Sequence, residues 1–219
     1  LEAGDRMPGA RWFPDTRLNY AENLLADRAA EETEALVFRG EVGPTRRLSW
    51  GQLRSGAASV AAALRADGVG PGDRVAGFLP NLPETVIAML GAASVGAVWS
   101  SCSPDFGVEG VVDRFGQIQP RVLFVADGYC YGGKDIDSLA TARLLMNELP
   151  SVERLVVVPF LGSGGDLPER SCLWEDYCAP HAGTQPEYTR LPFDHPLFIM
   201  FSSGTTGLPK CMVHSAGGT

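Results

Sequence analysis

The chain has 219 residues, of which 45% are hydrophobic and 20% are charged, and its formal net charge is −8. That length is enough for a substantial core, and the composition is ordinary for a globular protein. The acidic balance and the lack of a basic stripe argue against non-specific nucleic-acid binding, because neutralising phosphates takes clustered Lys and Arg.

The first predicted element is a hairpin, with strands at 36–39 and 46–49 around a Gly/Pro turn. Ser49 is a suitable helix N-cap, and the apolar residues after it recur at helical spacing, which predicts a helix over 51–66. The face predicted to be buried carries Leu53, Ala57, Val60, Ala61 and Leu64. A Pro-Gly-Asp turn then leads into a strand at 74–79.

A buried helix over 82–95 and a strand at 97–100 come next, inside a stretch without charged residues from Thr85 to Pro104. Glycines and serines interrupt this stretch, and its apolar part is shorter than the ~20 residues that a membrane span needs. The beginning of the chain has no apolar core of the kind found in signal peptides. We therefore predict no membrane span.

The remaining elements continue the alternation of helices and strands. They are a helix over 108–118, a strand at 121–125, a helix over 139–149 and a strand at 155–158. Strand–helix–strand units of this spacing predict an α/β fold with a mostly parallel sheet layered with helices. Residues 166–195 are polar and rich in proline, which predicts a surface connection with a short helix at 173–177.

The motif that carries most chemistry is Ser202-Ser203-Gly204-Thr205-Thr206-Gly207-Leu208-Pro209-Lys210. It lies between an apolar run at 196–201, which predicts a buried strand, and a second strand at 211–213. Glycines permit close backbone approach, N–H and hydroxyl groups donate to phosphate oxygens, and the lysine adds a positive charge. The motif predicts a triphosphate clamp, and its simpler interpretation is a flexible turn.

The motif is not a Walker A loop, because Pro209 stands where that loop needs a glycine before the lysine. The segment from Gly128 to Lys134 comes closer in spacing, but Asp135 replaces the hydroxyl residue that would hold magnesium. Tyr129 and Tyr131 alternate before two glycines, so this segment is predicted to be a β-hairpin.

Cysteine usage points to a reducing compartment. The chain has five cysteines, an odd number with no Cys-x-x-Cys pair, which favours free thiols in a cytoplasmic protein. Cys172, Cys178 and His181 are close in sequence, but their spacing is not that of a zinc site and no fourth ligand is nearby. No metal site is therefore predicted.

The string from Phe201 to Lys210 resembles the phosphate-binding signature of the adenylate-forming superfamily, which includes acyl-CoA synthetases, luciferases and adenylation domains of peptide synthetases. The superfamily usually has glycine after the lysine, and this chain has Cys211. The segments 10–25 and 210–219 are similar to those of short-chain acyl-CoA synthetases. They are most similar to the members that activate acetoacetate. The resemblance covers essentially the whole chain.

This resemblance implies the domain organisation as well as the fold. It covers only the first third or so of such an enzyme. Residues 1–45 are expected to be an N-terminal segment of the acyl-CoA-synthetase type. Residues 46–219 are expected to be the first part of the large AMP-binding domain, which is incomplete at the C-terminus. The adenine pocket, the acyl pocket and the C-terminal domain are expected downstream.

The resemblance also implies an activity: ATP-dependent ligation of acetoacetate to CoA through an acyl-adenylate, with release of pyrophosphate and AMP. ATP, Mg²⁺ and CoA are the implied co-substrates, and Lys210 is the implied catalytic residue. The implied ligands of the ATP phosphates are Ser202, Ser203, Gly204, Thr205, Thr206, Gly207 and Lys210. No carboxylate ligand for Mg²⁺ is evident in the sequence.

A second implied contact concerns CoA. Tyr131-Gly132-Gly133-Lys134 aligns with an Arg-x-Gly-Arg/Lys turn that meets the CoA nucleotide phosphate in relatives of acetyl-CoA synthetase. Tyr131 replaces the arginine, so either Lys134 serves alone or the turn is structural. Three other functions stay open: an acetyl- or propionyl-CoA synthetase, an adenylation module that loads a carrier, and a non-catalytic nucleotide-binding domain.

Overall fold

The computed structural model of the chain describes residues 1–6, 8–26, 30–162, 166–202 and 207–219. The elements up to the middle of the chain are β1 (Arg17–Leu18), α1 (Tyr20–Leu24), β2 (Glu34–Phe38), β3 (Arg46–Ser49), α2 (Trp50–Ala66), β4 (Arg74–Phe78), α3 (Pro83–Val95), β5 (Val98–Cys102) and α4 (Val108–Ile118). Those that follow are β6 (Val122–Ala126), β7 (Gly128–Tyr131), β8 (Lys134–Asp137), α5 (Leu139–Glu148), β9 (Arg154–Val158), β10 (Ser171–Leu173), α6 (Trp174–Cys178), the 3₁₀ helix η1 (Ala179–His181), β11 (Leu191–Pro192), β12 (Pro196–Ser202) and β13 (Lys210–Ser215).

The main sheet has the strand order β10-β9-β6-β4-β5-β12-β13. All neighbours pair in parallel except β12 and β13, which pair antiparallel. The chain moves from β4 to β5 on one side and then returns to β6 on the other side of β4. This reversal makes β4 the topological switch point, and open α/β sheets bind ligands outside the carboxyl ends of the strands at such a point.

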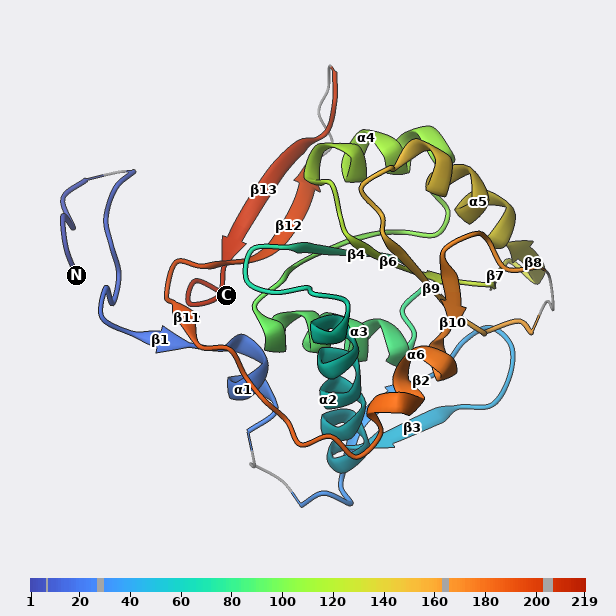
Figure 1. Cartoon of the computed structure of the whole chain (residues 1–219), viewed down its shortest axis with the longest axis horizontal. Helices are drawn as coiled ribbons and strands as arrows, with labels where there is room; N and C mark the ends of the chain where they lie inside the picture. The colour runs from blue at the N-terminus through green and yellow to red at the C-terminus, as the bar shows by residue number, and fades with distance from the viewer. Residues whose placement is uncertain (7, 27–29, 163–165, 203–206) are drawn as a thin grey trace.

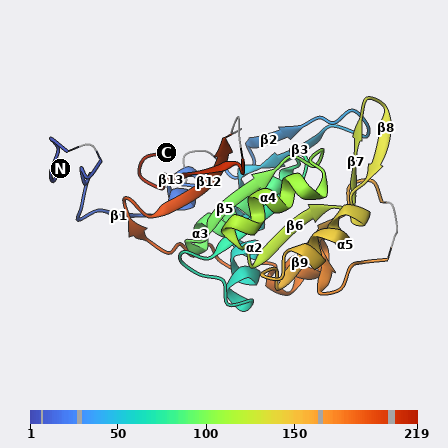
Figure 2. The ribbon, with the colours of Figure 1, turned by 90° about the horizontal axis from the view of Figure 1, so that it is seen from above.

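Helices cover both faces of this sheet, as the sequence predicts. Figures 1 and 2 show α4 and α5 on one face and α2, α3 and α6 on the other. Successive strand residues point to opposite faces, so Phe124 packs under α2, α3 and α6 while Leu123 and Val125 pack under α4 and α5. The two faces therefore have separate apolar cores, which hold the strand ends in fixed positions.

Helix α2 begins and packs as its sequence predicts. The Ser49 side chain accepts from the Gln52 N–H and the Gln52 side chain accepts from the Ser49 N–H, a complete capping box. Its five predicted core residues are all buried. Helix α3 crosses it so closely that a Cβ at Gly91 would lie 2.5 Å from the Val60 side chain. Glycine at this position is required by the packing of the two helices.

Two expectations about the second half need correction. The apolar run at 196–201 does form a strand, β12, but of its residues only Leu197 is buried. The segment 166–195 holds the predicted short helix as α6, but it is more than a surface connection. Its residues 171–173 form β10, which pairs in parallel with β9 and extends the main sheet, and residues 191–192 form β11, which pairs with β1.

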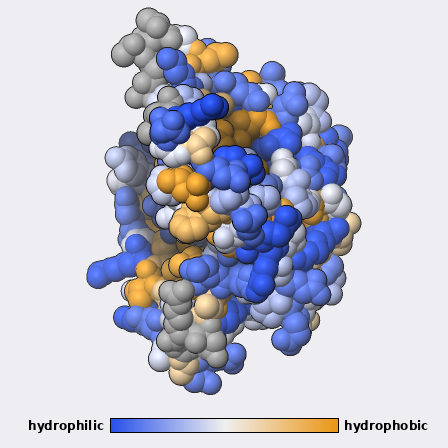
Figure 3. All heavy atoms as spheres, turned by 90° about the vertical axis from the view of Figure 1, so that its left-hand side faces the viewer, coloured by the Kyte–Doolittle hydropathy of each residue, from blue (hydrophilic) through white to orange (hydrophobic). Residues whose placement is uncertain are grey.

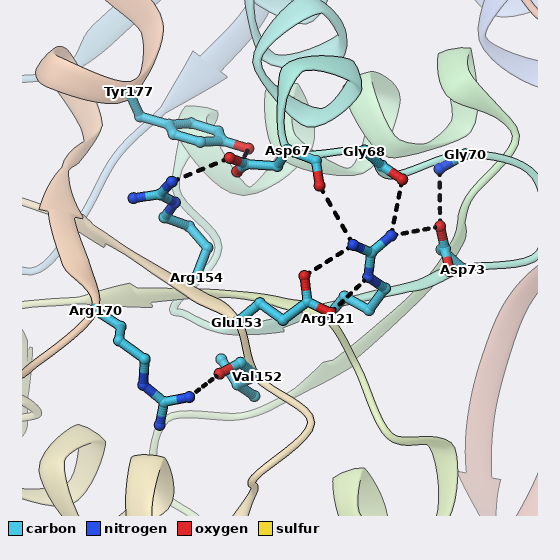
Figure 4. Close-up of polar contacts among 10 residues, drawn as sticks. All are labelled: Asp67, Gly68, Gly70, Asp73, Arg121, Val152, Glu153, Arg154, Arg170 and Tyr177. Carbon is cyan, nitrogen blue, oxygen red and sulfur yellow. Dashed lines mark hydrogen bonds and ion pairs between the residues drawn. The ribbon is translucent and has the colours of Figure 1, made fainter.

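The amino ends of the central strands are tied together by Arg121, which directly precedes β6 (Figure 4). Its Nη1 donates to Asp73 Oδ2 at 3.0 Å and to the Gly68 carbonyl at 2.8 Å, and its Nη2 donates to Glu153 at 2.8 Å. Nearby, Asp67 accepts from Arg154 at 3.1 Å and from the Tyr177 hydroxyl at 3.1 Å. This polar network lies at the amino ends of the strands, opposite to the edge where the parallel strands end.

The outer edge of the sheet, formed by β13, exposes apolar side chains. On β13, Met212 and Val213 are 42% and 59% exposed, and Met200, the partner of Met212 on β12, is 54% exposed. Figure 3 shows hydrophobic residues at the surface on the side of the molecule that carries this edge. Exposed apolar surface on an edge strand favours pairing with another strand, from the same protein or from a second copy.

Candidate functional site

The predicted phosphate-binding residues lie in and beside the connection between β12 and β13. The two strands pair with Phe201 opposite Cys211 and Ser202 opposite Lys210, so the ends of the motif meet across the ladder. Gly207 has a φ of +85°, which suits glycine. Ser203, Gly204, Thr205 and Thr206 lie outside the described residues. Of the predicted phosphate ligands, the structure places Ser202, Gly207 and Lys210.

Strand β12 carries this connection to the carboxyl edge of the sheet. It runs parallel to β5, with Phe198 paired to Trp99, and the Ser100 hydroxyl donates to the Ile199 carbonyl at 2.7 Å. Because parallel strands end at the same edge, Ser202 lies on the edge where β4 and β5 end. The Lys210 side chain is exposed there.

A cavity of about 550 Å³ opens at the same edge. It is lined by the residues that follow β4 and β5 and by the hairpin of β7 and β8, among them Asn81, Thr85, Ser103 and Tyr131. Cys102 also lines it, and burial raises the pKa of this thiol to about 12, so the thiol is protonated and unreactive at neutral pH. The cavity has the position and the size of a small-molecule site.

The turn of the β7–β8 hairpin already holds an anion. Gly132 and Gly133 have φ values of +59° and +73°, and their N–H groups donate to the two carboxylate oxygens of Glu41 at 3.1 and 3.0 Å. These two hydrogen bonds hold the pKa of the Glu41 carboxyl below its ordinary value, and the bond from Gly133 has the larger effect. Successive N–H groups that converge in this way form an anion-binding concavity. Lys134 follows the turn directly and is exposed.

Neither a metal cluster nor a membrane-spanning helix is found among the described residues. No group of three or more His, Cys, Asp and Glu side chains in that part of the chain is placed to hold a metal ion. No helix there is long and apolar enough to cross a membrane. All five cysteines are free, and burial raises the pKa of the Cys178 thiol to about 12.

A family model described as AMP-binding enzyme matches residues 25–219. The chain belongs to this family. It is 52% identical over 224 residues to an acetoacetyl-coenzyme A synthetase of Rhizobium meliloti (strain 1021), a match that covers 100% of this chain and 34% of that protein. It is 46% identical over 220 residues to an acetoacetyl-CoA synthetase of Rattus norvegicus, over 95% of this chain and 32% of that protein.

A solved structure supports the same relationship. An acetoacetyl-CoA synthetase from Streptomyces lividans superimposes with a TM-score of 0.89 at 49% identity, over 97% of this chain and 32% of that chain. The α/β fold expected for the first part of the large domain of an adenylate-forming enzyme is confirmed. The chain spans about a third of the length of these relatives. The division of the chain at residue 45 stays a prediction.

In this AMP-binding enzyme the two lysines of the chain, Lys134 and Lys210, lie on hairpins on either side of β4 and β5. Lys210 begins β13 beyond β5, and Lys134 lies in the hairpin that follows β6. The carboxyl ends of β4 and β5, which line the cavity, lie between them. The sequence motifs thus predict two separate anion contacts at one edge of the sheet.

Sequence reasoning missed Glu41, which occupies the turn of the second hairpin. Glu41 lies 91 and 92 residues before the glycines whose N–H groups it accepts from. It belongs to the connection between β2 and β3, a stretch with no motif of its own. No local signal in the sequence indicates a contact of this kind.

Proposed function

We propose that the complete protein is an ATP-dependent ligase that joins acetoacetate to CoA. A carboxylate oxygen of acetoacetate attacks the α-phosphorus of ATP, the bond from that phosphorus to the pyrophosphate oxygen breaks, and acetoacetyl-adenylate forms. The CoA thiolate sulfur then attacks the acyl carbon, and the bond to the AMP oxygen breaks. The observation that carries the proposal is the sequence motif from Ser202 to Lys210, whose two end residues pair across β12 and β13 at the carboxyl edge of the sheet.

Lys210 is assigned to the first half of this reaction. The departing pyrophosphate gains negative charge as the α-phosphorus is attacked, and a lysine ammonium at the edge of the loop offsets that charge. Backbone N–H and hydroxyl groups of the loop bind the β- and γ-phosphates. The assignment covers Ser202, Gly207 and Lys210 and, from the sequence alone, the four residues from Ser203 to Thr206.

The turn at Gly132 and Gly133, with Lys134, is assigned to CoA. The two N–H groups already bind a carboxylate, which supports a capacity to bind a phosphate oxygen in the same place. Lys134 adds a positive charge beside them, and the adjacent cavity has room for part of the pantetheine arm. When CoA binds there, its phosphate displaces the Glu41 carboxylate.

The choice of acetoacetate is supported by the relatives, which carry that substrate in their names at 46–52% identity. Acetyl- or propionyl-CoA synthetase activity is the alternative that the fold also permits. A module that loads a carrier protein and a non-catalytic nucleotide-binding domain are less well supported. The chain is related over 95–100% of its length to proteins named as CoA-ligating enzymes.

The proposal also covers Mg²⁺, the cellular location and nucleic acid. The described residues bring no carboxylate cluster together that fits a magnesium ion, so no step through Mg²⁺ is assigned to this part of the protein. A cytoplasmic location is proposed because the five free cysteines suit a reducing compartment. The net charge of −8 is the basis for proposing that nucleic acid is not a partner.

The test is product analysis with the complete protein. Incubation with ATP, Mg²⁺, acetoacetate and CoA is expected to give AMP and acetoacetyl-CoA in equal amounts. Replacing CoA with a phosphopantetheinylated carrier protein is expected to give no loaded carrier. Formation of ADP in place of AMP, or a loaded carrier without acetoacetyl-CoA, would contradict the proposal.

A further inference from the structure

One side chain, Gln117 near the end of α4, contacts the residues on both sides of Lys210. Its Nε2 donates to the Pro209 carbonyl oxygen at 3.0 Å, and its Oε1 accepts from the Cys211 thiol at an Sγ–Oε1 distance of 3.8 Å. These partners lie 92 and 94 residues away in the chain. The segment that carries Lys210 is therefore attached to α4 on both sides, through the backbone of Pro209 and the side chain of Cys211.

The orientation of the Gln117 amide is determined by its partners. Besides Pro209, Nε2 donates to the Asp113 carbonyl oxygen at 2.6 Å, which is the i−4 position of the same helix. A carbonyl oxygen only accepts, so both contacts need the nitrogen, and the amide oxygen is left for the thiol. With both N–H groups engaged, the exposed side chain of Gln117 has one preferred position.

The same helix also contacts β12, the strand that leads into the motif. Arg114 lies three residues before Gln117 and hence on the same side of α4. Its guanidinium carbon is 4.3 Å from the Phe106 ring centroid and 6.0 Å from that of Phe201, the residue before Ser202. Figure 1 shows α4 beside the end of β12 and the beginning of β13. One face of α4 thus meets the strands on both sides of the phosphate motif.

We propose that Gln117 is a positioning residue for adenylate formation, acting through Lys210. A lysine has a long flexible stem, so its ammonium group is aimed at one place only if its backbone is held. Gln117 contacts both neighbours of Lys210, Pro209 at its backbone carbonyl and Cys211 at its thiol. Cys211, which stands where the superfamily usually has glycine, supplies the second of these contacts. The proposal rests on the proposed role of Lys210.

The variant that tests this is Gln117→Met in the complete protein. Methionine has a similar length and helix propensity but makes none of the three hydrogen bonds of Gln117. We expect the ATP-dependent adenylation rate, measured by acetoacetate-dependent ATP–pyrophosphate exchange, to fall about fivefold, an effect set by loss of the stronger of the two contacts beside Lys210, the hydrogen bond to the Pro209 carbonyl. Thioester formation from CoA and preformed acetoacetyl-adenylate is expected to be unchanged, because Lys210 has no part in that step. Gln185→Met, at an exposed glutamine in a loop far along the chain from α4, is the matched control and is expected to behave as wild type.

A double-mutant cycle separates this inference from the proposed function. In a Lys210→Ala background, Gln117→Met is expected to cause no further loss of exchange, because Gln117 acts only by positioning Lys210. If Lys210→Ala alone left exchange unchanged, the proposed role of Lys210 would fail. If Lys210→Ala slowed exchange but Gln117→Met did not, the inference alone would be overturned. It would also be overturned if Gln117→Met slowed both half-reactions equally. The same holds if Gln117→Met lowered exchange in the Lys210→Ala background by the same factor as in wild type.

Discussion

Lys210 lies directly opposite Ser202 in the antiparallel ladder of β12 and β13, and its side chain is exposed. Lys210→Ala in the complete protein therefore removes a charge without removing a packed side chain. We expect ATP–pyrophosphate exchange to fall about 100-fold, which is typical for loss of a group that stabilises developing charge. The thermal unfolding curve is expected to stay that of wild type.

Lys134→Ala is the matched control for this variant, since it makes the same change at the only other lysine of the chain. Exchange does not involve CoA, so Lys134→Ala is expected to leave exchange unchanged and to raise the KM for CoA. Exchange by Lys210→Ala within twofold of wild type would rule out the assigned role of Lys210.

Glu41→Ala is expected to lower the KM for CoA, because the Glu41 carboxylate occupies the N–H groups assigned to the CoA phosphate. The carboxylate is ionised at neutral pH, since its pKa is lowered by these same bonds. For an exposed contact we expect a change of about threefold. The measurement is the KM for CoA compared with that for pantetheine, which lacks the nucleotide phosphates and is expected to show no change.

Glu32→Ala, at another exposed glutamate of the N-terminal part, is the control for the lost negative charge. An increase in the KM for CoA in Glu41→Ala would mean that Glu41 supports the shape of the turn and does not compete with the ligand.

Arg121→Met is expected to destabilise the amino edge of the sheet without affecting either half-reaction. The guanidinium makes contacts with Asp73, Glu153 and two backbone carbonyls (Figure 4), and methionine replaces none of them. Part of this network is exposed to solvent, so we expect a loss of about 2 kcal/mol. Native-state hydrogen exchange of the β4 and β6 amides measures this loss.

Arg47→Met is the control, because the ion pair of Arg47 with Glu34 is mostly exposed. It is expected to leave the exchange of the β4 and β6 amides unchanged. Equal protection of these amides in Arg121→Met and in wild type would show that the network contributes nothing to stability.

The regular elements of the fold were predictable because their signals are local. The helix α4 has the predicted bounds, and α2 begins at the predicted cap, Ser49. Helix α1 was missed because it has only five residues and is held by Asn19, whose side-chain amide donates to the carbonyls of Ala93, Ser94 and Thr189. Strand β10 was missed because its three residues are extended by pairing with β9.

The candidate site was predictable only in part. The motif ending in Lys210 has a local signature, so its position between two strands followed from the sequence. The contacts of Glu41 and Gln117 join residues about 90 positions apart, and nothing in either stretch indicates its partner. The burial of β12 was also wrongly predicted, because the composition of an apolar run does not show which part of the protein covers it.

Residues 1–219 alone are expected to associate through the edge formed by β13. Met212 and Val213 are exposed on that strand and Met200 on the adjoining β12, and a bare edge strand pairs readily with another. Val213→Lys is expected to reduce the association, because lysine on an edge strand opposes such pairing. Val42→Lys, at another exposed valine, is the control and is expected to have no effect. Analytical ultracentrifugation distinguishes the outcomes, and a monomeric wild-type chain would contradict the prediction.

The central claim is that the complete protein activates acetoacetate as an adenylate. Its most direct test is ATP–pyrophosphate exchange with the purified complete protein in the absence of CoA, with acetoacetate, acetate, propionate and butyrate compared as substrates. The account predicts exchange that depends on the acid, with the highest kcat/KM for acetoacetate. A higher kcat/KM for acetate would assign the protein to acetyl-CoA synthesis, and the absence of exchange with every acid would contradict adenylate formation itself.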